Sequence, residues 1–278
     1  MVNKFGKSKK VKGKSPHTHK HKSYVPSVIN RVIEEADIIL EVLDSRFIEK
    51  TRNYEIEKKV KKLGKLIIYV FNKSDLVNIN EIKLNRELEK LKPNLFLSSK
   101  EKNGYANLKR LIKIESKRLK QEFVNIGIVG YPNTGKSSLI NFLTGKSAAK
   151  TSSEAGYTKG MQKIKLSKGL YLIDTPGIIP ILEKSSTSIK NLVKQPQIGA
   201  VSWDKTKDSD LVVNELMKEY PNVLEKHYNI NVSMDIDSEI FIEKLGKKLN
   251  YLKKGNLVDE IRTAKKILRD WQEGKIKV

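Results

Sequence analysis

The amino-acid sequence predicts an α/β fold with a mostly parallel sheet, followed by a helical region. Two observations support this prediction: short apolar runs alternate with helix-forming stretches, and strand signals stop after about residue 182. Strands that alternate with helices usually form a parallel sheet covered by helices on both faces. We therefore expect a disordered basic arm over 1–24, an α/β domain over 25–182 and a helical domain over 183–278.

Each expected strand is a short apolar run of the kind found in strands buried on both faces. The runs cover residues 38–43, 66–71, 95–97 and 124–129, with a last pair at 161–166 and 170–173. Periodic apolar patterns predict helices at 28–36, 54–63, 80–91, 108–122 and 136–143. In the C-terminal region, we expect helices over 209–220 with Ser209 as N-cap, and over 257–271 with Asn256 as N-cap.

The chain is strongly basic, with 55 Lys and Arg against 32 Asp and Glu, and a net charge of +23. Such an excess predicts a polyanionic partner, with nucleic acid first and an anionic membrane surface second; the alternative is that the charge only maintains solubility. The basic residues gather in the acid-free N-terminal arm, in 108–120 and along the helix expected at 257–271. The opposite face of that helix is expected to be apolar, through Leu257, Ile261, Ala264, Leu268 and Trp271.

Composition also narrows the possible chemistry. The chain has no cysteine, which excludes disulfides, a thiolate nucleophile and Cys-ligated metals, and suits a reducing compartment such as the cytoplasm. No apolar run reaches the roughly 18 residues that a membrane-spanning helix needs. We expect a cytoplasmic protein without a membrane partner, and a monomer.

Residues 130–137, GYPNTGKS, match the phosphate-binding pattern G-x-x-x-x-G-K-[ST] between an expected strand and an expected helix. Small residues let successive backbone N–H groups surround a phosphate chain, and the helix start adds its positive dipole end. In this pattern Lys136 reaches the β- and γ-phosphates, and the hydroxyl of Ser137 binds Mg²⁺.

Two further segments fit a nucleotide switch. Asp174 and Gly177 belong to the segment DTPG at a strand end, where the acid can hold Mg²⁺ through water and the glycine N–H can approach a γ-phosphate. The alternative for this segment is a plain turn. Thr158, flanked by Gly156 and Gly160, can supply a second Mg²⁺ hydroxyl when a γ-phosphate is present.

Residues 72–75, NKSD, directly follow the second expected strand. The Asp75 carboxylate can accept from the two adjacent N–H groups of guanine, a pair that adenine does not offer. Asn72 can bond the other edge of the base, and the stem of Lys73 can lie over the ring. The alternative is an Asx-turn with a helix cap. Ser98, Ser99 and Lys100, after the third strand, are candidate base contacts.

These segments resemble the GTPase motif set in a permuted order. NKSD and SSK come first, and the P-loop, Thr158 and DTPG follow, which is the order of the circularly permuted GTPases. The chain is similar to the YlqF/RbgA family of large-subunit assembly GTPases, including its archaeal and eukaryotic relatives. Asp44-Ser45-Arg46 resembles that family's DAR motif, with Ser45 in place of Ala and without the usual proline. Two roles are open for Asp44 and Arg46: the role that the motif has in that family, or no more than a structural ion pair.

The resemblance implies a circularly permuted P-loop GTPase domain over 25–182 and an RNA-binding helical domain over 183–278. It implies GTP or GDP and Mg²⁺ as ligands, with Lys136, Thr158 and Gly177 as catalytic groups. The expected nucleotide contacts are Asn72, Lys73, Asp75, Ser98, Ser99, Lys100, Asn133, Thr134, Gly135, Lys136, Ser137, Ser138, Thr158, Asp174 and Gly177. Mg²⁺ is expected to bind Ser137 and Thr158 directly and Asp174 through water. Asn133 resembles the residue that helps hold a K⁺ ion near the phosphates in related GTPases. The alternative role of Asn133 is to stabilise a turn.

Hydrolysis is expected to be slow and stimulated by ribosomal particles. Where many GTPases have a water-orienting Gln after the DxxG segment, this chain has Ile178 and Ile179. The expected function is assembly of the large ribosomal subunit through its rRNA. The alternatives are a nucleotide-gated RNA-binding scaffold with negligible hydrolysis, an ATP-using P-loop enzyme and a membrane-surface protein. His17, His19 and His21 are candidates for catalysis, metal binding, RNA contact or a solvated tail.

Overall fold

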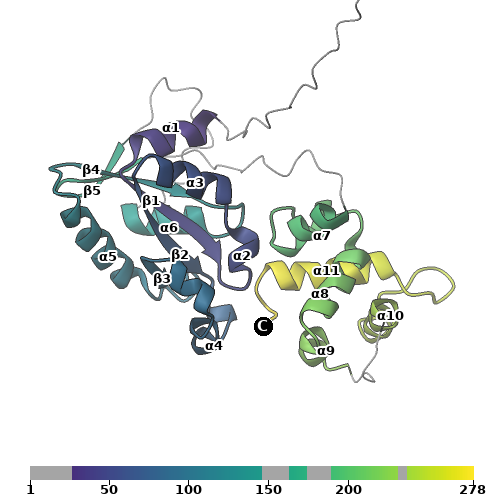
Figure 1. Ribbon diagram of the computed structural model, residues 1–278. Helices are drawn as coiled ribbons and strands as arrows, with labels where there is room; N and C mark the ends of the chain where they lie inside the picture. Colours follow the sequence, from purple (N-terminus) through teal and green to yellow (C-terminus); the bar gives the residue numbers. More distant parts are fainter. Residues whose placement is uncertain (1–26, 146–162, 174–188, 231–236) are drawn as a thin grey trace, which may run out of the picture.

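The computed structural model describes residues 27–145, 163–173, 189–230 and 237–278. Two parts lie side by side: a sheet with its flanking helices, and a group of helices from the C-terminal half (Figure 1). The expected N-terminal arm over 1–24 lies outside the described residues. None of the described helices combines the length and the apolar character that crossing a bilayer requires.

The sheet has six strands in the order β3-β2-β1-β4-β6-β5. Their bounds are β1 Ile38–Asp44, β2 Leu66–Asn72, β3 Asn94–Phe96, β4 Val124–Val129, β5 Lys163–Ser167 and β6 Leu170–Ile173. All neighbours are parallel except β5 and β6, which form an antiparallel pair joined by a turn at residues 168–169. The α/β fold with a mostly parallel sheet is confirmed, because the apolar runs form strands buried between two helical layers.

The strand register places several chain segments at one edge of the sheet. Asp44 at the end of β1 is paired with Asn72 at the end of β2, and β4 ends at Val129, which is paired with Glu41 of β1. The loops that follow β1, β2, β3 and β4 therefore meet at the carboxyl edge of the sheet. Ligand sites of open parallel sheets lie at this edge.

Helices cover both faces of the sheet. On one face, α1 (Ser27–Glu35) and α3 (Tyr54–Lys62) pack their apolar residues on β1 and β4. On the other face lie α5 (Tyr105–Arg118) and α6 (Lys136–Thr144). The approach of α1 is close enough that a Cβ on Gly127 would meet the Val32 side chain at 2.8 Å.

Two expected helices differ in extent. Residues 80–91 form two short helices, α4 (Ile79–Lys83) and a 3-10 helix at Arg86–Lys90, because the Asn85 side chain accepts from the Glu87 N–H and starts a new turn. The helix expected from residue 108 begins at Tyr105, after Gly104 in the left-handed region at φ 85°. These are boundary differences and do not alter the sheet order.

The C-terminal part consists of helices around Trp271, which is fully buried. The helices are α7 (Ile189–Gln197), α8 (Ser209–Glu219), α9 (Val223–Tyr228), α10 (Ser238–Lys248) and α11 (Glu260–Gln272). Phe47, which follows β1, belongs to the same hydrophobic cluster, and its ring centroid lies 5.7 Å from that of Trp271. The two parts of the molecule therefore share a core.

Both expected N-caps of this region are wrong. Ser209 is the first residue of α8, and Asp208 precedes it. In α11 the cap is Asp259, whose carboxylate accepts from the Arg262 N–H, because Asn256 lies in the left-handed region at φ 60° within a turn.

The apolar face expected on the last helix is correct only in part. Leu257 precedes α11 and is 68% exposed, and Ile261 is 58% exposed. Ala264, Leu268 and Trp271 are buried as expected, together with Ile267, which the expected face omitted. Because the helix begins later than predicted, its buried stripe starts after its first turn.

Candidate functional site

The loop between β4 and α6 has the backbone of a phosphate-binding loop. Gly130, Asn133 and Gly135 all have positive φ values, of 147°, 60° and 100°. A Cβ on Gly130 would lie 2.4 Å from the Val42 carbonyl oxygen, so only glycine fits there. Helix α6 then starts at Lys136 without a side-chain cap, which leaves its first N–H groups available to an anion.

Lys136 lies half-buried at the start of α6. Burial lowers the pKa of its ammonium group to about 8. Its Nζ donates to the Tyr131 carbonyl of the same loop. An anionic ligand at this position would restore the charged form, because an opposite charge favours it.

The Asn72 side chain holds the loops that follow three strands. Its Nδ2 donates to the Thr134 carbonyl at 2.7 Å, and its Oδ1 accepts from the N–H and the hydroxyl of Ser99 at 3.1 and 3.0 Å. A Cβ on Gly135 would lie 2.0 Å from that Nδ2, so the second glycine of the loop makes room for Asn72. Asn72 therefore bridges two motifs, and its expected bond to a base edge stays a prediction.

Asp75 is oriented by the neighbouring serine segment. The Ser98 hydroxyl donates to Asp75 Oδ1 at 2.6 Å and accepts from the Glu101 N–H at 3.0 Å. Lys73 has φ 60°, and its Nζ lies 2.7 Å from the Asp44 carboxylate. A carboxylate held this way can accept from a ligand with adjacent N–H groups.

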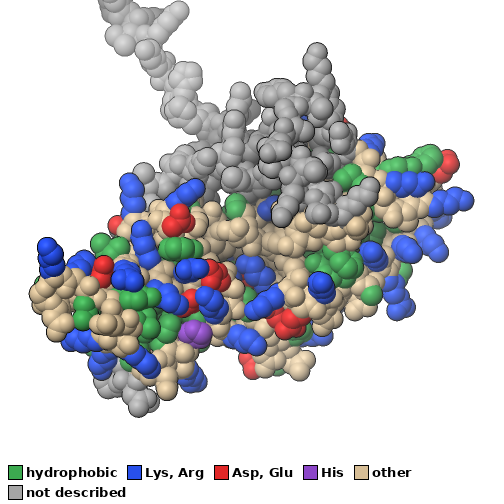
Figure 2. Space-filling model, turned by 180° about the vertical axis from the view of Figure 1, so that it is seen from behind, with side chains coloured by type: hydrophobic (Ala, Val, Ile, Leu, Met, Phe, Trp, Pro, Cys, Tyr) green, Lys and Arg blue, Asp and Glu red, His purple; other side chains and the backbone are tan. Residues whose placement is uncertain are grey.

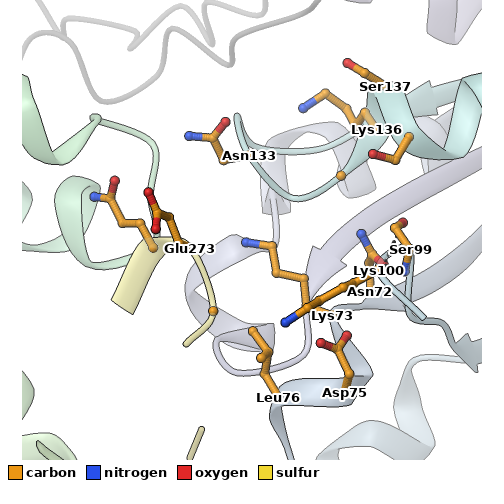
Figure 3. A pocket seen from close by; sticks show the side chains of 14 residues that line it. Asn72, Lys73, Asp75, Leu76, Ser99, Lys100, Asn133, Lys136, Ser137 and Glu273 are labelled. Atoms are coloured by element: carbon orange, nitrogen blue, oxygen red, sulfur yellow. Dashed lines mark hydrogen bonds between the residues drawn. The ribbon is translucent and has the colours of Figure 1, made fainter. Parts of the chain in front are cut away.

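Side chains from these separate segments converge on one cavity of about 520 Å³ (Figure 3). The expected contacts that line it are Asn72, Lys73, Asp75, Ser99, Lys100, Asn133, Gly135, Lys136, Ser137 and Ser138. Ser98 and Thr134 are buried behind this lining, at 1% and 0% exposure, and support it through their hydrogen bonds. The motifs are far apart in the sequence but adjacent in space.

The cavity has a wall that the sequence did not indicate. Gln272, Glu273 and Gly274 line it from the end of α11, and Figure 3 shows Glu273 across from the loop residues. Leu76, directly after the NKSD segment, completes the lining. No local motif marks the α11 residues, because their position depends on how the C-terminal helices dock.

Three expected site residues, Thr158, Asp174 and Gly177, lie outside the described residues, as do the N-terminal histidines. Strand β6, which neighbours β4 in the sheet, ends at Ile173, the residue before Asp174 in the sequence. Within the described ranges there is no cluster of three His, Asp or Glu residues that could hold a metal on its own. The oxygen ligand expected from Ser137 suits Mg²⁺, which commonly binds few protein oxygens together with substrate phosphates.

The family described as 50S ribosome-binding GTPase matches residues 125–237. The chain is 38% identical over 256 residues to the uncharacterized GTP-binding protein MJ1464 of Methanocaldococcus jannaschii, covering 91% of this chain and 66% of that protein. It is 32% identical over 255 residues to nucleolar GTP-binding protein 2 of Saccharomyces cerevisiae, covering 88% and 51%. The chain thus spans about two thirds of the archaeal relative and half of the nucleolar one.

Solved structures of YlqF have the same fold. The GDP-bound form matches with a TM-score of 0.63 at 23% identity, over 90% of this chain and 96% of that one. The GNP-bound form from T. maritima matches with a TM-score of 0.61 at 24% identity, over 89% and 92%. The likeness of fold therefore extends over about nine tenths of this chain.

Proposed function

We propose that this chain, which belongs to the circularly permuted GTPases related to YlqF, binds and hydrolyses GTP as a switch during assembly of the large ribosomal subunit. The observation that carries the proposal is the convergence of the P-loop, the NKSD segment and the SSK segment on one cavity, despite their permuted order. The chain ends of compact domains usually lie at the surface. The order of the segments along the chain can therefore be permuted while the sheet and the nucleotide site at its edge are preserved. The family match to 50S ribosome-binding GTPases and the nucleolar relative support the ribosomal part.

In this proposal Asp75 selects guanine. The carboxylate is held by the Ser98 hydroxyl at the cavity wall and accepts from N1–H and N2–H of the base. Lys100 and the stem of Lys73 contact the ring. The α6 N-terminus and Lys136 bind the phosphates, with Ser137 and Ser138 beside them.

For hydrolysis, Lys136 stabilises charge on the transferred phosphoryl group, and we propose that Thr158 and Gly177 join it when GTP is bound. Mg²⁺ on Ser137, Thr158 and, through water, Asp174 would neutralise developing charge when present. We further propose that K⁺ binds beside Asn133. The chain has Ile178 where a water-orienting Gln is common, so hydrolysis is slow until a ribosomal particle stimulates it.

The surplus positive charge is proposed to bind rRNA. Figure 2 shows Lys and Arg side chains spread over both parts of the visible face, with fewer acidic ones between them. Exposed basic residues of the helices include Lys109, Arg110, Lys113, Lys117 and Arg118 on α5, and Lys244, Lys247 and Lys248 on α10. On α11 the Arg262 guanidinium lies 4.1 Å from the Tyr251 ring centroid. Arginine and aromatic planes of this kind stack on unpaired bases.

We also propose how GTP acts as a switch. The segment that follows Gly177 leads along the chain into the C-terminal helices, so a γ-phosphate that holds Gly177 would reposition them on RNA. Small-angle scattering with GDP and with a non-hydrolysable GTP analogue tests this step. Identical profiles in both states would contradict it.

The proposed function is tested by nucleotide competition and particle sedimentation on the full chain. We expect GDP and GTP to displace a fluorescent GDP analogue, and ADP to fail at matched concentration. Large-subunit precursors are expected to bind the protein with a steep loss on added salt, while GDP affinity changes much less. Turnover measured in K⁺ with these particles separates a GTPase from a scaffold, which would show no stimulation.

A further inference from the structure

Arg46, just after β1, is bonded to the end of a helix 225 residues further along the chain. Its Nη1 donates to the Trp271 carbonyl at 2.7 Å, in the last turn of α11. The last carbonyls of a helix lack intrahelical partners, and a cation there also interacts favourably with the helix dipole. The guanidinium further lies 5.4 Å from the Trp271 ring centroid and 4.8 Å from that of Phe47. Arg46 therefore caps α11 from the sheet.

The same guanidinium forms a two-pronged ion pair with the Asp44 carboxylate at the end of β1. Arg46 Nε and Nη2 donate to Asp44 Oδ1 and Oδ2 at 3.1 and 2.9 Å, while Lys73 Nζ lies 2.7 Å from Oδ2. The Asp44 side chain is fully buried and that of Arg46 is 1% exposed. Burial alone would raise the pKa of Asp44, but Arg46 and Lys73 hold it below its ordinary value. One buried carboxylate thus joins the helix-capping arginine to the lysine of the NKSD segment.

Ser45, between these two residues, adds a second link to the same segment. Its N–H and its hydroxyl both donate to the Asn72 carbonyl, at 2.8 and 2.7 Å. Alanine, the residue usual in the resembling motif, would keep only the first of these bonds. The end of β1 therefore holds the start of the NKSD segment through backbone and side chain.

The C-terminal end of the chain contacts the other end of that segment. The Val278 N–H donates to the Leu76 carbonyl at 3.2 Å. A Cβ on Gly274 would meet the Leu76 side chain at 2.9 Å, so the turn after α11 lies directly on this residue. The segment from Asn72 to Leu76 is thus held at one end by residues 44–46, of which Arg46 contacts α11, and at the other end by the residues that follow α11.

We propose that Arg46 is a positioning residue that couples the docking of α11 to guanine reading by residues 72–76. The proposal rests on the proposed function, because it takes Asp75 as the guanine contact. When α11 is docked, Arg46 aligns Asp44, which fixes Lys73 and, with Ser45, the backbone that carries Asp75. By linkage, guanine binding stabilises the docked helix to the same degree. An RNA that displaces α11 would then weaken the hold on the base and promote nucleotide exchange.

The first test compares GDP with IDP, whose base lacks the N2 amine that Asp75 accepts from. Wild-type protein is expected to bind GDP about tenfold or more tighter than IDP, the value of one charge-assisted hydrogen bond. Arg46→Lys keeps the positive charge but loses the two-pronged guanidinium contact with Asp44 and the hydrogen bond to the Trp271 carbonyl. We therefore expect the ratio of GDP affinity to IDP affinity to fall at least about threefold. Arg52→Lys is the matched control, because Arg52 pairs with Glu49 and Glu57 and not with residues 72–76 or α11.

If the ratio of GDP affinity to IDP affinity is the same in Arg46→Lys as in Arg52→Lys, the proposed coupling between α11 and guanine binding is wrong. Ser45→Ala provides a second test that carries little risk to folding, and we expect a smaller fall of about twofold in the same ratio. Equal affinity of the wild-type protein for GDP and ADP would instead overturn the proposed function itself, so the two failures are distinguishable.

Hydrogen exchange tests the reciprocal direction. Saturating GDP is expected to increase protection over residues 260–278 in the wild-type protein and in Arg52→Lys. In Arg46→Lys at saturating GDP we expect that increase to be lost, because guanine binding is no longer coupled to the docking of α11. An equal increase in all three proteins would contradict the proposal, since a purely structural role of Arg46 would leave it unchanged.

Discussion

The amide nitrogen of Asn133, in the P-loop, donates a 2.5 Å hydrogen bond to the Gly199 carbonyl, just beyond α7. Tyr131 of the same loop is buried in the hydrophobic cluster of the C-terminal helices, and the Lys194 ammonium lies 5.7 Å from its ring centroid. The phosphate-binding loop is therefore packed against the helical part on its outer side. A movement of those helices would be transmitted directly to the loop.

Asn133→Ala and Asn133→Asp separate the two roles of this side chain. If the amide oxygen helps hold K⁺, we expect Asn133→Ala to lose the stimulation of hydrolysis by K⁺ over Na⁺. Asn133→Asp loses the N–H donor to Gly199 and adds a negative charge, but it keeps an oxygen ligand for a cation, so K⁺ stimulation relative to Na⁺ should persist. Steady-state phosphate release in the two salts measures this. Full K⁺ stimulation in Asn133→Ala would contradict the potassium site.

Gly135→Ala is expected to weaken nucleotide binding strongly. The added Cβ would lie 2.0 Å from Asn72 Nδ2, and the residue has φ 100°, so the loop must shift. We expect GDP affinity to fall by about a hundredfold or more, consistent with the cost of strained backbone and a broken bridge of roughly 3 kcal/mol. Gly145→Ala, at the other end of α6, is the control: it has φ 66° but nothing within 4 Å of an added Cβ. GDP affinity within threefold of wild type in Gly135→Ala would contradict the proposed loop geometry.

GDP binding should take up a proton at alkaline pH. Burial lowers the pKa of Lys136 to about 8, so the free protein has mostly neutral Lys136 at pH 9, whereas the phosphates favour the charged form. Affinity should fall by up to about tenfold per pH unit above pH 8 and change little below pH 7. Calorimetry at pH 9 in two buffers of different ionisation enthalpy measures the uptake. Lys136→Arg, which stays charged, should show none; equal uptake in both would contradict the assignment.

Glu41→Gln should remove a pH-dependent loss of stability. Burial and then Glu57 raise the pKa of Glu41 from 4.5 to about 8, and only its Oε1 is bonded, to the Asn53 N–H at 2.9 Å. At a pH between the unfolded pKa of 4.5 and the folded pKa of about 8, Glu41 keeps its proton in the folded protein but has lost it in the unfolded chain. Stability therefore falls as pH rises, by up to about 1.4 kcal/mol per unit.

Urea unfolding at pH 5, 6.5 and 8 measures this slope. We expect Glu41→Gln to flatten it and to be more stable than wild type at pH 8. Glu89→Gln, on the exposed surface, should keep the wild-type slope. An unchanged slope in Glu41→Gln would show that Glu41 is ionised in the folded protein.

The sequence predicted most of the sheet because each buried strand is a short apolar run bounded by polar turns. Much of the cavity lining also consists of residues expected from local motifs at strand ends, such as Asp75 and Lys136, while their contacts with a nucleotide stay predictions. Glu273 was missed because its place in the cavity depends on the long-range docking of α11. Ile261 was wrongly expected in the core, since the helix starts at the Asp259 cap rather than at Asn256.

The central claim, that the NKSD segment reads guanine in a permuted GTPase site, is tested most directly by Asp75→Asn. The amide accepts from N1–H and donates to a carbonyl at C2, which suits xanthine, while it loses the charge-assisted bonds to guanine. In competition binding, the account predicts that GDP affinity falls at least about tenfold and that XDP binds the variant more tightly than GDP. Unchanged GDP affinity in a folded Asp75→Asn protein would contradict it.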